Sequence, residues 1–398
     1  MPPPPPAQPQ VNLLERLHMK PEAGTLYLQG MQAFNTFDLQ NAKSMLEQAT
    51  KTDPKAYEAF FSLGTVQERL RDPQATASYK QAFSVQPDFE PAMVAYAAAL
   101  AKKGNFTEAE RFLNEQRSKL PKSAALLATL AEFKSQQKDS GQAQKMAQEA
   151  LKLNPDYKPA MVIIARDHYR NRRIDLALYA LQAILDGFKP VEENPPRDKD
   201  NAEARYLRGL IFREQGQRAA AMEEFRKALE KRPDMVEARV HYATFLLEAG
   251  NPEEALPMLE GAVRFDADNV AAHLGLGDAY RVLSRFPEAK REFEWVLSRE
   301  PNLPQAHYDL GLLYLVAPSM TGMTALEQVT AAIASLKKFQ EVRTKSLGDD
   351  SDELLTRAKL REAEIKASLA PAEAAPPPPS PSPAATAESD AGAGGSAP

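Results

Sequence analysis

The chain of 398 residues contains no cysteine. This absence excludes a disulfide framework, a thiol nucleophile and a metal site built on cysteine. The chain also lacks a strong excess of either charge, because 49 basic and 54 acidic residues give a formal net charge of −5. A protein that binds nucleic acid or an anionic membrane surface normally carries a basic patch, so we expect neither kind of partner.

Long apolar segments are missing as well. No run approaches the roughly 20 residues that a membrane-spanning helix needs, so direct insertion into a membrane is not expected. The first ten residues, MPPPPPAQPQ, have neither the basic start nor the apolar core of a signal peptide. These absences indicate a cytoplasmic location by default. A periplasmic or outer-membrane-associated location is the alternative if the natural start lies upstream of Met1.

Catalytic and cofactor-binding motifs are also absent. The sequence contains no Walker loop, no HExxH and no GxSxG motif. The segment GLGDAY, which starts at Gly275, lacks the third glycine and the preceding strand of a dinucleotide-binding loop. Acidic neighbours such as Glu223 and Glu224 are expected on an exposed helix face, where water solvates them. We therefore predict a protein that is not an enzyme and that holds no cofactor and no metal.

The sequence does contain a repeat of about 34 residues. Each copy has two stretches with the apolar period of a helix, and the second stretch usually ends at a proline, which cannot continue a helix. One position is alanine in eight consecutive copies, separated by 33, 34, 34, 34, 44, 34 and 34 residues. These residues are Ala42, Ala75, Ala109, Ala143, Ala177, Ala221, Ala255 and Ala289. Such a period is typical of stacked helix-turn-helix units.

Two further positions fit the crossing of paired helices. We number the residues of each repeat from 1 to 34, and the first repeat starts at about Ala23. Position 8 is small, as a close crossing requires: Gly30, Gly64, Ala97, Ala131, Ala165, Gly209, Ala243, Gly277 and Gly311. Position 24 carries an apolar knob: Leu46, Tyr79, Leu113, Ala147, Leu181, Phe225, Leu259 and Phe293. On these residues the chain resembles the tetratricopeptide repeat family. The resemblance implies an all-α, right-handed superhelical solenoid of about nine repeats with a C-terminal capping helix and disordered termini.

The expected organisation has four parts. A proline-rich disordered arm with a short helix covers residues 1–22, and the solenoid covers residues 23–345. A capping helix at 346–370 and a disordered tail rich in proline and alanine at 371–398 complete the chain. The 44-residue step indicates that residues 187–200 contain an insertion of ten residues, a polar loop that is either functional or simply tolerated.

Two features that could suggest a ligand site fit the repeat instead. His273 and His307 are 34 residues apart, at position 4 of successive copies. We interpret this spacing as a packing register rather than a pair of metal ligands. Trp295, the single tryptophan, lies beside an apolar position and is expected to pack rather than to form a ligand platform.

The family resemblance also implies where a partner binds. In tetratricopeptide repeats the first helices line a concave groove, and positions 2, 5, 9, 12 and 13 face it. In repeats five to nine these positions carry aromatic and arginine side chains over an aliphatic floor, the residue types of binding hot spots. The candidate groove residues are Arg166, Tyr169, Arg170, Tyr206, Leu210, Arg213, Thr244, Leu274, Asp278, Arg281, Tyr308 and Leu312. The alternative for each is packing against the next repeat.

The function is therefore expected to be protein binding. The tails, the irregular ninth repeat and the ending DDSDELLTRAKLREAEIK are similar to those of tetratricopeptide proteins from the bacterial (myxobacterial) adventurous gliding-motility apparatus. That resemblance implies a scaffold that assembles or stabilises a multiprotein complex of the cell envelope. One alternative is a cytoplasmic adaptor or co-chaperone-like protein, although the lysine–asparagine clamp of chaperone-binding members is missing. Another is a non-catalytic subunit that positions an enzyme.

Overall fold

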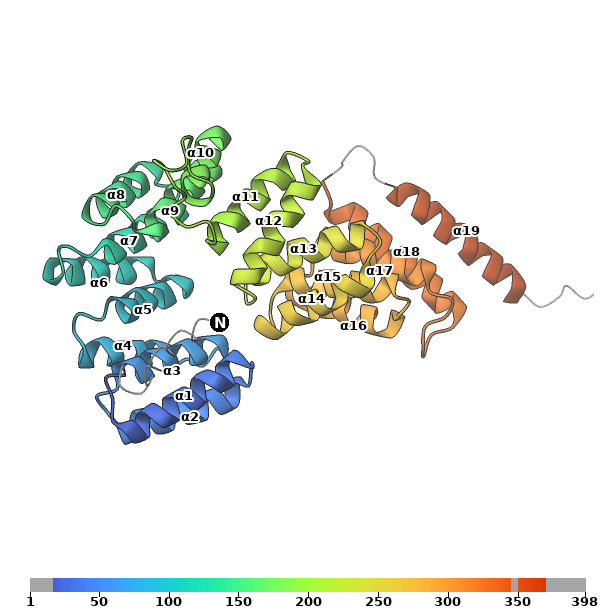
Figure 1. Ribbon diagram of the computed structural model, residues 1–398. Helices are drawn as coiled ribbons and strands as arrows, with labels where there is room; N and C mark the ends of the chain where they lie inside the picture. The colour runs from blue at the N-terminus through green and yellow to red at the C-terminus, as the bar shows by residue number, and fades with distance from the viewer. Residues whose placement is uncertain (1–16, 345–349, 370–398) are drawn as a thin grey trace, which may run out of the picture. The chain divides into compact units, whose positions relative to one another are not determined.

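The computed structural model describes residues 17–344 and 350–369. The start of the expected N-terminal arm and the tail at 371–398 lie outside the described residues. Regular structure in the described part is helical, apart from one isolated bridge between Phe188 and Asn194 (Figure 1). The helices are α1 (Pro21–Asn35), α2 (Leu39–Thr52), α3 (Tyr57–Arg69), α4 (Ala75–Val85), α5 (Glu90–Lys102), α6 (Phe106–Lys119), α7 (Ala124–Gln136), α8 (Ser140–Leu153), α9 (Lys158–Arg170), α10 (Ile174–Leu185), α11 (Ala202–Glu214), α12 (Arg218–Lys231), α13 (Val236–Glu248), α14 (Pro252–Phe265), α15 (Val270–Val282), α16 (Phe286–Arg299), α17 (Pro304–Val316), α18 (Ala325–Val342) and α19 (Ser351–Leu369).

These helices fall into two compact units, Met1–Pro301 and Asn302–Pro398. In the first unit, each odd-numbered helix from α1 to α15 packs against the helix that follows it, and each pair packs against the next (Figure 1). These pairs are the first eight repeats predicted from the sequence. In the second unit, α17 and α18 form the ninth pair, and α19 packs against α18. The predicted all-helical repeat architecture is thus confirmed.

The recurrent alanine lies in the interior of each of the first eight pairs. All eight alanines, from Ala42 to Ala289, have an exposed fraction of 6% or less. The knob at position 24 is equally buried, because Tyr79 is 2% exposed and the other seven are fully covered. Burial of both positions in every pair places the repeat boundaries where the 34-residue period predicts them.

Glycine at position 8 makes room for a large knob in the same repeat. A Cβ atom added to Gly209 would lie 2.6 Å from Cε1 of Phe225, and one added to Gly64 would lie 2.6 Å from Cδ1 of Tyr79. Real Cβ atoms essentially never come this close to another heavy atom. Where the knob is leucine, as in Leu113, position 8 is usually alanine. The two positions are therefore matched in size.

The turn inside each repeat of the first unit uses a left-handed residue. Three repeats place a glycine there: Gly104, Gly216 and Gly250. The other five place a residue with a side chain there, at φ between 55° and 66°: Phe37, Arg71, Lys138, Arg172 and Ser284. A side chain in this conformation costs roughly 1–2 kcal/mol. These five turns therefore carry a local strain that glycine would avoid.

The insertion at 187–200 folds back onto the end of α10. The backbone N–H groups of Arg197 and Asp198 donate to the carbonyl oxygens of Ala183 and Ile184, at 3.3 and 2.8 Å. Gly187 opens the loop at φ 73°, where an added Cβ would clash with the backbone of the loop. The insertion is consequently held by hydrogen bonds to the preceding helix.

The second unit has a widened turn between its first two helices. Residues 317–324 separate α17 from α18, and Thr324 with Glu327 forms a capping box at the start of α18. Leu336 is fully buried, and an added Cβ on Gly311 would lie 2.8 Å from its Cγ. The first half of α19 packs through Leu355, whereas its end is exposed. The ninth repeat therefore keeps the same crossing despite its longer turn.

Candidate partner-binding pocket

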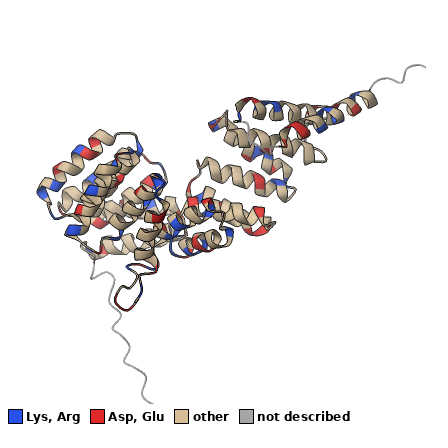
Figure 2. Ribbon diagram, turned by 90° about the horizontal axis from the view of Figure 1, so that it is seen from above, with Lys and Arg blue, Asp and Glu red and all other residues tan. Residues whose placement is uncertain are grey.

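The surface of the described helices carries no broad region of one charge. Figure 2 shows lysine and arginine residues interspersed with aspartate and glutamate along the helices. Many charges pair within one helix, as Arg226 does with Glu223 at 2.8 Å. None of the described helices is both long and apolar enough to cross a membrane. A concave site is consequently a better candidate for specific binding than any charged face.

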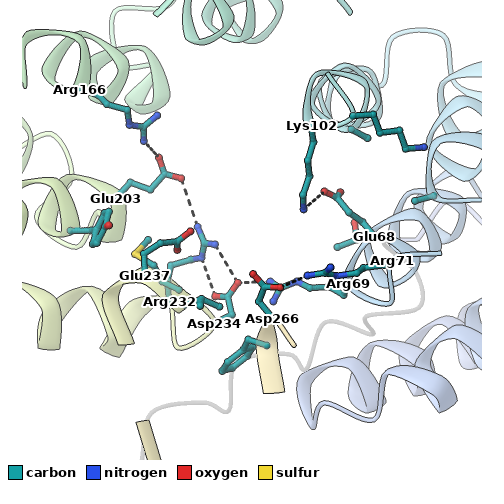
Figure 3. A pocket seen from close by; sticks show the side chains of 18 of the residues that line it. Glu68, Arg69, Arg71, Lys102, Arg166, Glu203, Arg232, Asp234, Glu237 and Asp266 are labelled. Carbon is teal, nitrogen blue, oxygen red and sulfur yellow. Dashed lines mark hydrogen bonds and ion pairs between the residues drawn. The ribbon is translucent and has the colours of Figure 1, made fainter. Parts of the chain in front are cut away.

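The first unit contains a pocket of about 1200 Å³. Its walls come mainly from first helices of repeats two, three, five, six and seven, namely α3, α5, α9, α11 and α13. The turn between α3 and α4, the start of α4, and the turns before α13 and after α14 complete the wall. Figure 3 shows that charged side chains from these elements point toward one another across the pocket.

Five of the twelve candidate groove residues line this pocket: Arg166, Tyr169, Arg170, Tyr206 and Leu210. Leu207, Met235 and Val236 add apolar surface beside them. The pocket thus combines arginine and tyrosine side chains with an aliphatic floor. Their role in binding a partner stays a prediction.

The other candidates lie elsewhere. Arg213 donates to Nδ1 of His241 at 2.6 Å, Thr244 donates to the carbonyl oxygen of Val240 at 2.9 Å, and neither lines the pocket. Candidates in repeat eight, Leu274, Asp278 and Arg281, are half-buried, and the last two pair with each other at 2.8 Å. Candidates in the second unit are Tyr308, which donates to Asp350 at 3.0 Å, and the half-buried Leu312.

One wall of the pocket is a continuous chain of ion pairs. Glu132 contacts Arg166 at 2.8 Å, and Arg166 contacts Glu203 at 3.0 Å. The chain continues to Arg232, 3.8 Å from Glu203 and 3.1 Å from Asp234 (Figure 3). Burial disfavours the charge on Arg166, but the two glutamates outweigh it and raise the pKa of its guanidinium. This wall therefore stays charged and internally paired.

The two tyrosines of the pocket are held by neighbours from the next repeat. Burial raises the pKa of Tyr206 to about 12, and its ring lies 6.0 Å from the His241 ring in a stacked arrangement. Burial and Glu214 raise the pKa of Tyr169 to about 12, and its hydroxyl donates to Glu214 at 2.5 Å. Both phenols are therefore protonated at neutral pH.

The rim of the pocket joins repeats that are far apart in sequence. Arg69, at the end of α3, contacts Asp234 at 2.5 Å across 165 residues. Arg71 contacts Asp266 at 2.6 Å and also Asp268. Burial works against the charge on Asp234, but Arg232 and Arg69 outweigh it and lower the pKa of this carboxyl to about 2.

Sequence reasoning missed these rim residues. The groove positions carried over from the family lie on first helices, whereas Asp234 and Asp266 lie in turns between repeats. The one available signal was Arg71, which occupies a turn position that is glycine in three other repeats.

The expectation that Glu224 is solvated is wrong. Its side chain is buried and pairs with Arg205 at 3.1 Å and with Arg208 at 2.8 Å. Both arginines lie on α11, one helix before, so the acid side chain links the two helices of repeat six. Helix periodicity alone does not reveal such a partner.

His273 and Trp295 pack against each other. Their ring centroids are 3.6 Å apart, and the two nitrogens of His273 contact Glu292 at 2.5 Å and the carbonyl oxygen of Ala267 at 3.0 Å. The described residues contain no cluster of side chains that could hold a metal ion. These contacts support the packing interpretation of both residues.

Comparison with known proteins agrees with this architecture. Sequence models of the tetratricopeptide repeat match residues 73–133, 134–195, 212–260 and 246–313, which together make up more than half of the chain. Among solved structures, the APC/C hetero-tetramer Cut9-Hcn1 is similar with a TM-score of 0.54 and 15% identity, over 85% of this chain and 76% of that one.

Two smaller solved proteins are also similar. Pseudomonas aeruginosa pilF has a TM-score of 0.45 and 15% identity, over 62% of this chain and 97% of that one. YrrB, described as a TPR protein with an unusual peptide-binding site, has a TM-score of 0.40 and 20% identity, over 54% of this chain and 97% of that one. At these identities the likeness concerns the fold alone. The sequence matches, together with the buried repeat positions, show that the chain belongs to the tetratricopeptide repeat family.

Proposed function

We propose that this protein is a non-enzymatic scaffold that binds a segment of another protein in the pocket of its first unit. By doing so it would assemble or stabilise a multiprotein complex. The observation that carries this proposal is the pocket itself, because five repeats contribute arginine, tyrosine and aliphatic side chains to one concave site. These residue types supply most of the binding energy in protein interfaces.

The size of the pocket favours a peptide segment over a small metabolite. Small-molecule sites usually measure roughly 300–1,000 Å³, whereas this pocket measures about 1200 Å³. The charged wall is already paired, so it does not demand one strongly charged ligand. Two exposed cations line the pocket: the side chain of Lys102 is 75% exposed and pairs with Glu68 at 3.6 Å, and that of Arg170 is 37% exposed and pairs with Glu132 at 3.3 Å. They suit the carbonyl and carboxylate oxygens of an extended segment.

The protein that binds in the pocket would identify the complex that this scaffold assembles. We infer a cell-envelope motility complex from the similarity of the tails to gliding-motility proteins, with a cytoplasmic adaptor and a subunit that positions an enzyme as the alternatives. Each alternative predicts a different class of captured protein: an envelope component, a soluble client or a catalytic subunit.

Photo-cross-linking in the native cell tests both the site and the partner. A photoreactive phenylalanine at Leu210 would sample the pocket, and the same residue at Arg226 would serve as a matched control, because Arg226 is exposed on α12 and does not line the pocket. We expect a discrete cross-linked protein from position 210 that is missing from position 226. Mass spectrometry of that product would identify the class of partner.

A pair of substitutions provides the quantitative test. Tyr169→Ala combined with Leu210→Ala should weaken binding of the captured protein at least tenfold, because both half-buried side chains line the pocket. Arg226→Ala should leave affinity unchanged. Equal cross-linking from both positions, or unchanged affinity in the double variant with an intact melting curve, would place the interface outside the pocket.

A further inference from the structure

Side chains from repeats one and two meet side chains from the turns after repeats six and seven. We name this set the clasp. On one side it comprises Phe37, Arg69 and Arg71, and on the other Asp234, Phe265, Asp266 and Asp268. The ionic contacts lie at the pocket rim, and all but Phe37 and Asp268 also line the pocket.

An aromatic contact reinforces the ionic ones. The rings of Phe37 and Phe265 meet edge to face, with centroids 4.3 Å apart and an interplanar angle of 87°. This is a preferred geometry for an aromatic pair. The guanidinium of Arg239 lies 4.9 Å from the centroid of the Phe265 ring. The clasp thus contains both a charged part and an apolar part, held by side chains from four separate turns or helix ends.

Helix packing does not impose the clasp. Among the described helices, substantial packing is confined to the same and to adjacent repeats, as expected for a solenoid. Repeats one and two meet repeats six and seven through the side-chain contacts of the clasp, without substantial helix-on-helix packing. The clasp can therefore open while every repeat keeps its own helix pair and its neighbours.

The backbone of the clasp is strained in a way that glycine would relieve. Phe37 and Arg71 occupy the left-handed turn position, at φ 63° and 55°. In three other repeats that position is glycine: Gly104, Gly216 and Gly250. Phe37 and Arg71 are the two such residues whose side chains reach across to distant repeats. Their contacts compensate for a backbone conformation that disfavours any side chain.

Exposure makes the ionic part of the clasp sensitive to salt. The side chain of Arg71 is 55% exposed, and those of Asp266 and Asp268 are 38% exposed. Pairs as exposed as these are weak and are screened by ions. Arg69 and Asp234 are less exposed, at 28% and 21%, so this pair is the more persistent one.

We propose that the clasp is a salt-sensitive latch that closes the concave face of the first unit over the pocket and must open for a protein segment to enter or leave. This inference rests on the proposed function, because it assigns a gate to the same pocket. With the clasp closed, one superhelical turn of the solenoid becomes a ring, and access to the pocket is restricted. Opening leaves the pocket walls intact and exposes its mouth.

Spin-label distances test whether the latch opens. The absence of native cysteine allows clean labelling of Gln40→Cys and Glu254→Cys, two exposed positions on α2 and α14. We expect one short, narrow distance distribution at about 0.01 M salt, where the Debye length is about 30 Å. At about 1 M salt, or with Arg69→Ala and Arg71→Ala, the distribution should shift to longer values and broaden. Arg226→Ala removes one exposed arginine outside the clasp and should not change the distance distribution.

Thiol accessibility tests whether the latch gates the pocket, without knowledge of the partner. In a Leu210→Cys protein, a maleimide on a long polyethylene glycol chain should react severalfold faster when the clasp arginines are replaced by alanine. The small reagent N-ethylmaleimide should react equally fast in both proteins. A cysteine at position 226 controls for reagent strength, because neither reagent should respond to the clasp there.

The two tests separate the gate from the function. Distance distributions that ignore both salt and the arginine substitutions, or equal rates for the long reagent, would overturn the latch. Cross-linking of a partner from position 210 could still succeed in that case. Conversely, a working latch without any cross-linked partner would count against the proposed function alone. Melting curves of each variant establish that the helix pairs remain folded.

Discussion

A glycine and an aromatic ring form one matched unit at the helix crossing of three repeats. Gly64 faces Tyr79, Gly209 faces Phe225 and Gly277 faces Phe293. The knobs are at most 2% exposed, so they have no free volume to move into. The stability cost of replacing the glycine is therefore expected to depend on the size of the knob that faces it, and the reverse.

Gly209→Ala should destabilise the first unit by roughly 1–3 kcal/mol, because its Cβ would overlap the ring of Phe225. The double substitution with Phe225→Leu should cost less than the sum of the two single ones, since leucine is the usual partner of alanine here. Denaturant unfolding measures all three. Gly141→Ala is the control for glycine replacement without overlap, because Gly141 lies within helix α8 and the nearest atom to its Cβ position, Oδ1 of Asp139, is 3.9 Å away. Strictly additive costs would contradict the matched pair.

His241 makes the pocket region sensitive to acid. Burial and the neighbouring Arg213 lower its pKa to about 4, from about 6.5 in the unfolded chain. The folded state therefore disfavours the charged imidazole. Its contribution to stability is complete above pH 6.5 and is lost as the pH falls toward 4.

The free energy of unfolding should consequently drop by about 2 kcal/mol between pH 7 and pH 5 on account of His241. A His241→Gln variant lacks this titration and should show a correspondingly flatter pH dependence. Chemical denaturation at both pH values gives the difference. Parallel curves for the two proteins would show that the ring is hydrated in the native state.

The pKa of Asp234 is also lower in the folded state, so its contribution to stability is likewise lost as the pH falls, but in a lower pH window. Its folded pKa of about 2 lies below the unfolded value of about 3.9. The stabilisation by its ion pairs is present above pH 4 and is lost only as the pH falls toward 2. Between pH 5 and pH 8 the Arg69–Asp234 pair is accordingly expected to respond to salt and not to protons.

At the scale of elements, one left-handed turn allows backbone strain to be measured where no clasp contact depends on the side chain. Lys138 occupies the same turn position as Arg71, at φ 66°, and its side chain is exposed. Because no clasp contact depends on it, Lys138→Gly should raise the free energy of unfolding by roughly 0.5–1 kcal/mol through relief of the turn. Lys138→Ala removes the same charge without relief and should give no such gain. Equal stabilities of the two variants would show that the turn is not strained.

Local pattern explains how much of the fold could be predicted. Alanine at 34-residue steps, proline after the second helix and glycine at the crossings each act within one repeat, so a single sequence reveals them. Glu224 was misjudged because its arginine partners lie on another helix. The sequence likewise does not reveal that Arg213, a groove candidate, contacts His241, 28 residues away. Which side chains pair between helices and between repeats depends on their positions in space, and the repeat period does not reveal those positions.

At the scale of the whole molecule, the pocket depends on curvature. Arg69 and Asp234 are 165 residues apart and meet only because the four repeats between them, three to six, bend the solenoid back on itself. No single repeat specifies that bend, since it accumulates from small rotations between neighbours. Five pocket residues could be predicted because they occupy groove positions known from the family. The clasp residues occupy none of those positions, so the family pattern does not predict them.

Removal of residues 302–398 should leave the pocket functional, because the pocket and the clasp lie within the first unit. Cross-linking from position 210 is expected to persist in the shortened chain. Loss of cross-linking, with the helical content of the first unit retained by circular dichroism, would instead assign binding to Tyr308 and Leu312 in the second unit. The full-length protein measured in parallel provides the reference yield.

The clasp also changes how the first unit responds to mechanical tension. An open solenoid stretches like a soft spring, because each repeat yields a little relative to the next. A ring closed by Arg69, Arg71 and Phe37 stays stiff at low pulling force and then lengthens abruptly when those contacts part. Inside an assembly that pulls on its components, this unit would resist extension until the force reaches the value at which the clasp opens. The ionic strength of the solution would set that force.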